Sequence, residues 1–491
     1  MAFFTAQFSK GMNDVIDPAL IGDSAASFLL NADIESGKIK SMKSPDLLPQ
    51  TSPEQFEHYG NNKRSVAKWY ERYYWSDNTS NKAPYYGGDK ENYLGIPYPD
   101  YGNDVVFEKV SDGNHSGDYK YCVTFVNENG WEGAPGSLTE YEKKFTLNSE
   151  DMKITVKWSD ERISYAKIYR TQKEGADFYC VGEVKRSGES FTDSTDDYTL
   201  VGLEMISTLD NYPPPEKGKY LTESGGVFFL AVGSTLYFSV LGNPHGWPPL
   251  NFIGFDDVIT GITSEFQGVL VFTSNNAYQI TGAGDVTTVT KVLLPGNQGC
   301  PNYRSISHVS NAPVWLSNDG LCMWNGESVT IISKQVLNTS RLQVSTAVSA
   351  NDRYYLFLTS GGIIFDHRNG SVFYKTDFSC EYAWYDSDSD VIYMQRGESI
   401  YRYGYGEESI FIYRSGHIGV PESQYNYYRE VICSIEGDCK VTARIDGSDI
   451  FSVSVVSGKH RLKFPYDTVG RYCEIEVSGI GELSELGVVY G

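Results

Sequence analysis

The sequence predicts an all-β protein, and three observations support this fold class. Aromatic residues make up 14% of the 491 residues, and 37 of them are Tyr, a residue enriched in strands. The chain also contains 48 Gly, enough to supply many tight turns between strands. We find no run of about 12 or more residues with a sustained helical period, so we expect little helix.

The clearest strands lie in residues 225–282, where two apolar hairpins follow each other. Each hairpin has an outgoing run, a short turn and a returning run, at 227–230 and 236–238 in the first and at 269–272 and 278–280 in the second. The runs are continuously apolar and do not alternate with polar residues. This pattern predicts strands that are buried on both faces.

Similar hairpins recur from residue 217 onwards. Their outgoing apolar runs begin near residues 226, 268, 312, 352 and 390, a period of about 40 residues. Each repeat is long enough for four strands, and four-stranded repeats of this length are typical of the blades of a β-propeller. We therefore expect residues 211–430 to form the main blades of a propeller with six or seven blades in total.

Residues 1–115 contain strand pieces that are too short to form a core of their own. One is a hairpin at 28–42 around a Ser36-Gly37 turn, and another is the β-rich piece at 65–78. The two prolines in 93–102 favour an irregular or edge segment. We expect the segment 1–115 to supply one or two blades and close the ring.

Two other segments differ from the repeating pattern. Residues 116–210 contain strands at intervals of about 10 to 15 residues, which predicts a small β-sandwich inserted into the larger fold. The proline-rich tract at 213–218 marks its end. Residues 431–491 alternate apolar and polar positions, for example at Val453 and Val455, and predict a second small sandwich with one wet face.

The charge and the cysteines limit the partners and the compartment. The formal net charge is −22, from 63 acidic and 41 basic side chains, and such a surface repels phosphate backbones, so we expect no tight non-specific binding of DNA. No apolar segment approaches the ~18 residues of a membrane span or resembles a signal peptide, so we expect a soluble protein that is not secreted. Its eight cysteines include no CxxC, and we expect reduced, mostly buried thiols.

Sequence motifs of catalysis are missing from the chain. None of the seven histidines lies in an HExxH, an HxH or a His-Cys cluster, and there is no GxSxG, P-loop or dinucleotide-binding GxGxxG. We expect these histidines on the surface or in loops. The sequence therefore predicts a protein that is not an enzyme, with no catalytic, cofactor-binding or metal-binding residues.

The segment SNDGLCMW at 317–324 resembles the Asp-box of sialidase-type propellers. Ser317, Asp319 and Trp324 fit the pattern S-x-D-x-G-x-x-W, but Gly320 comes one position early. An Asp-Gly corner between two strands accounts for these residues, so we expect a structural turn.

The segment DSDSD places carboxylates at Asp386, Asp388 and Asp390, as calcium loops do. An EF-hand continues with Gly at its sixth position and Glu at its twelfth, where this chain has Val391 and Gly397. A solvated hairpin turn is the favoured interpretation, and weak Ca²⁺ binding stays open.

Exposed aromatic residues could also stack against sugars. The Tyr-rich strands and the loop around Trp247 are candidates, because amphipathic aromatic rings suit that task. Propeller blades use the same residues to fill the space between sheets, and we favour this packing role. We expect Trp247 to be buried and structural.

An ordered series of motifs resembles the tail nozzle, or tail tubular, proteins of short-tailed bacteriophages. The resemblance covers roughly residues 217–430 and, less clearly, the N-terminal segments FSKGMNDVIDPALIG and NADIESGKIKSMKSP. The segment 116–210 is in turn similar to a fibronectin type III module. The motifs of the main region are YLTESGGVFFLAVGSTLYFS, WPPLNFIGFDDVITGI, GVLVFTSNNAYQITG, LPGNQGC, APVWLSNDGLCMWNG and IFIYRSGHIGVPESQYNYYREV.

The resemblance implies a structural virion protein that assembles as a hexameric ring below the portal and adaptor. Such a ring retains the packaged DNA, which later passes through its lumen without specific binding. It also implies assembly in the cytoplasm of the bacterial host, contacts with tail fibres, spikes or the host surface, and no stable insertion into a membrane. The acidic charge agrees with a channel that does not hold DNA.

Two alternatives belong to other functional classes. A propeller glycan hydrolase would place carboxylates about 5 to 10 Å apart in a central channel near Arg and Tyr. A non-enzymatic adsorption protein would bind host glycans through one of the two sandwich regions.

Overall fold

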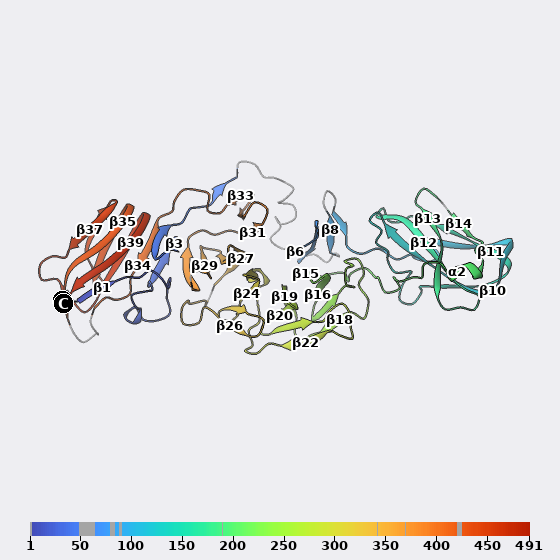
Figure 1. The fold of residues 1–491 in the computed structure, drawn as a ribbon, viewed down its shortest axis with the longest axis horizontal. Helices are drawn as coiled ribbons and strands as arrows, with labels where there is room; N and C mark the ends of the chain where they lie inside the picture. The colour runs from blue at the N-terminus through green and yellow to red at the C-terminus, as the bar shows by residue number, and fades with distance from the viewer. Residues whose placement is uncertain are drawn as a thin grey trace. The chain divides into compact units, whose positions relative to one another are not determined.

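The computed structural model describes residues 2–48, 64–78, 84–87, 91–188, 190–340, 342–368, 370–419 and 425–491. The protein is all-β, with repeated four-stranded antiparallel sheets that are consistent with a β-propeller (Figure 1). Contacts divide the chain into one compact unit of residues 1–62, 271–278 and 293–491 and a second of residues 63–270 and 279–292. No helix in the described residues is long and apolar enough to cross a bilayer.

The second unit contains two complete four-stranded sheets. The strands of the first are β6 (Arg64–Trp69), β7 (Arg72–Asp77), β8 (Tyr85–Gly87) and β9 (Glu91–Tyr93). The strands of the second are β15 (Lys219–Ser224), β16 (Val227–Val232), β17 (Thr235–Phe238) and β18 (Phe252–Gly254). The first strands of the two sheets, β6 and β15, lie against each other.

A further four-stranded sheet has some of its residues in the first unit and the others in the second. It consists of β19 (Ile259–Glu265), β20 (Gly268–Thr273), β21 (Ala277–Thr281) and β22 (Thr290–Leu293). Its first strand, β19, lies against β15. The residues of β16 and β20 are almost all buried, as their continuous apolar runs predict.

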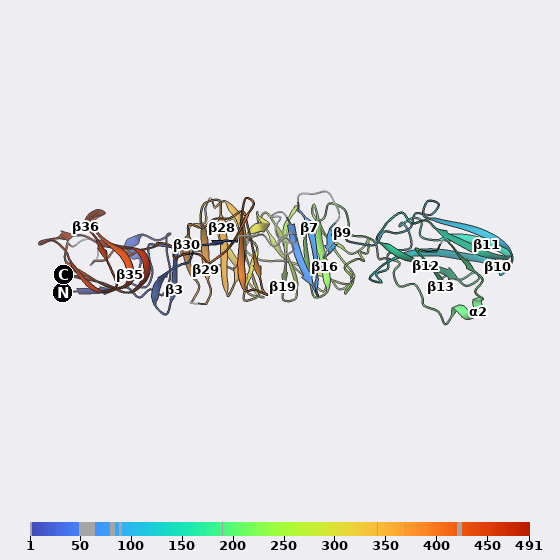
Figure 2. The same cartoon turned by 90° about the horizontal axis from the view of Figure 1, so that it is seen from above.

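The segment between β9 and β15 forms a separate five-stranded sheet in the order β13-β12-β10-β11-β14, whose long strands run side by side in Figure 2. Its strands are β10 (Val105–Asn127), β11 (Lys143–Val156), β12 (Ile163–Thr171), β13 (Phe178–Lys185) and β14 (Ser190–Asp193), followed by the short helix α2 (Asp197–Leu200). The sheet begins earlier than the expected boundary at residue 116, because Val105 already pairs with Val156. A long β-bulged first strand is hard to recognise from alternation alone.

The first unit contains three further groups of four strands. One group is β23 (Ser307–Val309), β24 (Ala312–Leu316), β25 (Leu321–Trp324) and β26 (Val329–Ile331). The next is β27 (Val344–Ala350), β28 (Arg353–Leu358), β29 (Gly362–Asp366) and β30 (Val372–Thr376). The last is β31 (Tyr382–Asp386), β32 (Val391–Arg396) and β33 (Ser399–Arg402), with the N-terminal strand β5 (Asp46–Leu47) as its outer member.

The predicted period of about 40 residues corresponds to these sheets. The runs expected near residues 226, 268, 312, 352 and 390 coincide with β16, β20, β24, β28 and β32, and each of these is the second strand of its sheet. The positions of the repeat are therefore confirmed. First strands again lie against one another, with β27 in contact with both β23 and β31.

The C-terminal strands form a sheet with strands from the N-terminus. They are β34 (Phe411–Arg414), β35 (Asn426–Ile445), β36 (Ser448–Val455), β37 (Gly458–Lys463), β38 (Val469–Gly470) and β39 (Cys473–Tyr490). The N-terminal partners are β1 (Ala2–Thr5), β2 (Phe28–Leu30), β3 (Ala32–Glu35) and β4 (Lys38–Ser41).

The pairing of these N-terminal strands corrects two expectations. Strands β1 and β4 pair with β39 and join no four-stranded sheet, whereas all strands of 1–115 were expected to complete the propeller. The C-terminal sheet is likewise not built from 431–491 alone. The hairpin around Ser36 and Gly37 does form as predicted, by the pairing of β3 with β4. Partners that lie more than 400 residues apart leave no trace in local periodicity.

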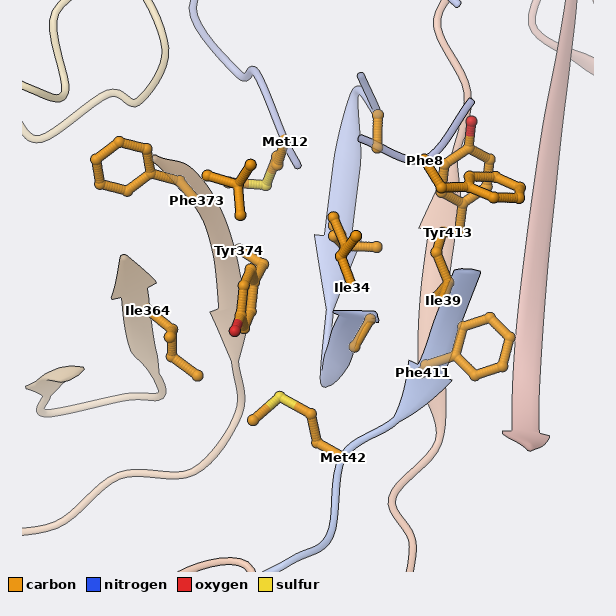
Figure 3. Packing of buried hydrophobic residues seen from close by; sticks show 14 of the residues in the cluster. Phe8, Met12, Ile34, Ile39, Met42, Ile364, Phe373, Tyr374, Phe411 and Tyr413 are labelled. Carbon is orange, nitrogen blue, oxygen red and sulfur yellow. The ribbon is translucent and has the colours of Figure 1, made fainter. Parts of the chain in front are cut away.

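The N-terminal hairpin shares one core with β30 and β34 in the first unit (Figure 3). Ile34 and Ile39 of the hairpin lie between Tyr374 of β30 and Phe411 of β34. Strand β2 pairs with both β30 and β34. The N-terminal segment therefore joins a four-stranded group to the C-terminal sheet through buried apolar contacts.

Candidate functional site

Trp247 is buried, as the sequence predicts, with 3% of its surface exposed. Its indole Nε1 donates to the backbone oxygen of Pro244 at 2.9 Å, and its ring packs in a cluster that includes Phe228 and Leu230. A buried indole with a satisfied N–H is a packing residue. The loop that carries Trp247 connects β17 to β18, and the buried ring offers no aromatic surface to a ligand.

His245 lies in the loop two residues before Trp247 and is buried. His115 of β10 is also buried, which corrects the expectation that the histidines lie on the surface or in loops. The Nδ1 of His245 accepts a hydrogen bond from the backbone N–H of Gly95 at 3.1 Å, and the ring packs edge-on against Tyr86. Burial, together with the charges of Arg162 and Arg72, lowers the pKa of His245 to about 3. The imidazole is therefore neutral and serves as an acceptor in a core.

The Asp-box-like segment forms the turn between β24 and β25. The hydroxyl of Ser317 donates to Oε1 of Gln298 and accepts from the backbone N–H of Asp319, and the Asp319 carboxylate accepts from Nε2 of Gln298. Gly320 has a φ of +144°. These side chains hold the turn against the preceding loop, which agrees with the predicted structural role.

Asp388 and Asp390 lie in the exposed turn between β31 and β32, and Asp386 is the last residue of β31. The carboxylate of Asp386 accepts from the backbone N–H of Asp388, and that of Asp390 accepts from the hydroxyl of Tyr385. The described residues contain no group of three or more His, Cys, Asp or Glu placed to hold a metal ion. The geometry is that of the solvated hairpin turn that the sequence favours.

All eight cysteines are free, and all but Cys180 are buried. Burial raises the pKa of both Cys300 and Cys322 to about 12, and that of Cys433 and Cys439 to about 11. Thiols held in this state are poor nucleophiles and poor metal ligands. They act as small apolar core residues.

Two buried ion pairs connect elements inside separate cores. In the five-stranded sheet, Arg170 of β12 contacts Asp193 of β14 at 2.8 Å with neither side chain exposed. In the first unit, Arg353 of β28 contacts Asp366 of β29 at 2.7 Å and also pairs with Asp33 of β3. Burial opposes ionisation of Asp366, but hydrogen bonds and charge from Arg368 and Arg353 keep its pKa below the ordinary value. These pairs fix how the strands meet.

A groove of about 660 Å³ lies beside the paired strands β35 and β39. Its walls include Glu436, Asp438 and Glu482, and Lys40 lies 3.8 Å from the Glu482 carboxylate. Nothing in the described residues beyond this acidic lining points to a ligand. We do not assign the groove a function.

The most distinctive surface lies at the start of β35 and consists of Tyr425, Tyr427, Tyr466, Val469 and Arg471, which we call the tyrosine face. The three Tyr side chains are 65%, 55% and 95% exposed, respectively. Tyr427 is the cross-strand partner of Val469, and the Arg471 guanidinium lies 6.0 Å from the centre of the Tyr425 ring. The face therefore combines flat aromatic rings with a stacked cation.

The backbone beneath the tyrosine face is held by buried polar side chains. Asn426 is 2% exposed, and its Nδ2 donates to the backbone oxygen of Arg471 at 3.1 Å. Tyr428 donates its hydroxyl to the oxygen of Ile418, and its N–H donates to the oxygen of Thr468. The rings consequently stand on a backbone with little freedom to rearrange.

Sequence reasoning missed the tyrosine face. The signal that could have identified it is the alternation of Tyr425 and Tyr427 with Asn426 and Tyr428, which is typical of a strand with one aromatic face outward. The partners of that strand, Val469 and Arg471, lie more than 40 residues away and become neighbours only through pairing with β38.

Comparison with known proteins gives no family. No protein-family model matches the sequence, and no curated protein matches it either. Among solved structures, BamB from Moraxella catarrhalis is 8% identical with a TM-score of 0.29, and the match covers 74% of this chain and 99% of that one. The WD40 domain of Pan2 from Neurospora crassa is 7% identical with a TM-score of 0.28, covering 64% of this chain and 90% of that one.

These similarities concern a β-propeller-like fold alone. At such identities and TM-scores they carry no argument about activity or partners. The candidate site therefore rests on the geometry of this chain.

Proposed function

We propose that the chain is the structural subunit of a hexameric tail nozzle of a short-tailed bacteriophage, which retains packaged DNA and forms the conduit for its ejection. The observation that carries the proposal is the ordered motif series. Three of its six members contain the second strands β16, β20 and β24, and a fourth spans β18 and the start of β19; of the other two, one follows β22 and one begins at β34. The resemblance thus follows the architectural repeat of the chain, as expected for a scaffold.

We further propose that the six groups of four strands form a closed propeller of six blades. In this arrangement β5, which precedes β6 in the chain, completes the sheet of β31, β32 and β33 as its outer strand. Pairing an N-terminal strand with the last sheet closes a ring without leaving a long free edge. The five-stranded sheet between β9 and β15 is then a fibronectin III-like insertion between the first two blades.

The acidic charge supports a conduit. With a net charge of −22, the assembled subunits repel a passing phosphate backbone and do not grip it. A lumen lined mainly by Asp and Glu would let DNA slide at physiological salt. The tail adaptor, the portal assembly and tail fibres or spikes are the partners that this role requires.

The test is the assembly state of the purified full chain, alone and mixed with a tail adaptor protein. Light scattering after size-exclusion chromatography should report a sixfold oligomer, and electron microscopy should show closed rings with an acidic lumen. A chain that stays monomeric with its adaptor present, or a ring with a basic lumen, contradicts the proposal. A gene position beside a portal or terminase gene would support it independently.

A further inference from the structure

We propose that the tyrosine face is a binding site for an anionic glycan, one that carries uronate, sialate or phosphate groups. This inference does not depend on the chain being a tail subunit. It rests on the exposure of the aromatic rings, on the cations beside them and on the rigid backbone beneath.

The aromatic rings are arranged as a platform. Tyr427 of β35 and Val469 of β38 lie opposite each other and share a face, and Tyr425, which directly precedes β35, has its ring beside the Arg471 guanidinium. Tyr466 lies at the tip of the turn before β38, and this turn is closed by the hydroxyl of Thr468, which donates to the oxygen of Pro465 at 2.8 Å. Because these rings are so exposed, they are not part of the hydrophobic core, and their flat faces can stack on the C–H faces of sugars.

Cations surround the platform although the chain as a whole is strongly acidic. Arg471 lies against Tyr425, and Arg429 and Lys463 are exposed close by in the strands β35 and β37. Among the described residues, neither Arg429 nor Lys463 forms an ion pair. Guanidinium groups bind carboxylate and phosphate in a bidentate manner, so these side chains select an anionic ligand.

Two of the acidic side chains near the platform already have hydrogen-bond or ion-pair partners. Glu430 pairs with Arg461 at 3.3 Å, and Asp446 accepts from the backbone N–H of Arg471 at 2.9 Å. Asp467, beside Tyr466, is the one exposed carboxylate within the turn. The three cations Arg429, Lys463 and Arg471 outnumber the two carboxylates that no cation neutralises, those of Asp446 and Asp467, so the side chains around the platform carry a small positive excess.

The size of the platform favours a glycan over a protein partner. A stable protein interface buries about 1,200 Å² or more and has an apolar centre. Here the exposed apolar residues are three tyrosines and one valine, and their neighbours Arg429, Asp467 and Lys463 are charged. A chain of a few sugar units matches this small, amphipathic surface.

The experiment uses the full chain and an array of uronate, sialylated and phosphorylated glycans, followed by calorimetric titration with oligogalacturonate and with the best array ligand. Neutral maltohexaose serves as the comparison ligand. We expect binding to the anionic glycans that weakens as salt is raised from about 0.05 to 0.5 M, and at least about tenfold weaker binding of maltohexaose.

The variants are Tyr425→Ala combined with Tyr427→Ala, and Arg471→Ala alone. Each should weaken binding of the anionic glycan at least about tenfold. The matched control is Tyr405→Ala, since Tyr405 is 51% exposed and also lies beside a guanidinium, that of Arg402 at 5.0 Å. This control should bind as the parent does. Thermal melting of every variant verifies folding.

Three results would overturn the inference. The first is that no anionic glycan on the array binds. The second is binding that survives in both tyrosine and arginine variants. The third is a change in oligomeric state of the tyrosine variant with unchanged glycan binding, which would make the face a contact between copies.

Discussion

At the scale of single residues, Trp247 shows how a loop side chain stabilises the sheets beside it. We expect Trp247→Ala to lower the free energy of unfolding by about 3 to 5 kcal/mol, because it leaves a cavity in a packed cluster. Chemical denaturation monitored by circular dichroism measures the change. Leu250→Ala, in the same loop but 72% exposed, should cost less than about 0.5 kcal/mol. Equal effects of the two changes would contradict the packing role.

His245 gives the fold a dependence on pH. Its pKa, about 3 in the folded protein, lies below the ordinary value of about 6.5, so the unfolded chain binds more protons between these values. Stability from this residue is complete above about pH 6.5 and is lost as the pH falls towards 3, by up to about 4 kcal/mol. Denaturation at several pH values measures the slope.

The variant His245→Asn should flatten that slope, because the amide oxygen can accept from Gly95 but does not titrate. The exposed residue His367 provides the control, and His367→Asn should leave the slope as it is in the parent. A slope that survives in the His245 variant would show that other groups cause the loss of stability in acid.

At the scale of elements, the close pairing of β35 with β39 depends on glycine. Gly481 has a φ of +127°, and a Cβ there would lie 1.9 Å from the backbone oxygen of Glu436. Gly447, at the turn between β35 and β36, has a φ of +80°, but its nearest contact would be 3.8 Å away, at the hydroxyl of Tyr472. Both positions have a positive φ that strains any residue other than glycine, but only at Gly481 would a side chain also clash with the backbone. Comparing the two therefore separates the steric clash from the backbone strain.

We therefore expect Gly481→Ala to cost at least about 2 kcal/mol more than Gly447→Ala, which should cost about 1 kcal/mol. Thermal and urea unfolding of the two variants measure the difference. If the costs were equal, the close approach of β35 and β39 would not be needed for stability.

At the scale of the whole molecule, the two expected sandwich regions differ in independence. All strand pairs of β10 to β14 lie within residues 105–193, around a core that includes Tyr121, Phe125 and Ile154. The C-terminal strands instead pair with β1, β4 and, through β34, β2.

We expect a fragment of residues 94–212 to fold by itself, with dispersed amide signals in NMR and a cooperative thermal transition. A fragment of residues 431–491 should not, since it exposes the β39 edge that β1 and β34 cover. Adding the N-terminal segment as a separate peptide should rescue it in part. Cooperative unfolding of 431–491 alone would refute this account of the C-terminal sheet.

The sequence by itself determined the fold class, the repeat of about 40 residues and the burial of Trp247. Local pattern suffices for these features, because continuous apolar runs at β16 and β20 reveal strands buried on both faces. It also predicted the turns near Ser317 and Asp386, since turn chemistry is local.

Tertiary structure alone decided which distant strands pair and which exposed side chains become neighbours. The pairing of Phe4 with Val488 and the proximity of Arg471 to Tyr425 each join residues that no local period connects. Strand partners are chosen by the burial of whole faces and the satisfaction of backbone hydrogen bonds across the sheet, and these contributions depend on the complete fold. The partners of the N-terminal strands and the tyrosine face therefore became visible only in three dimensions.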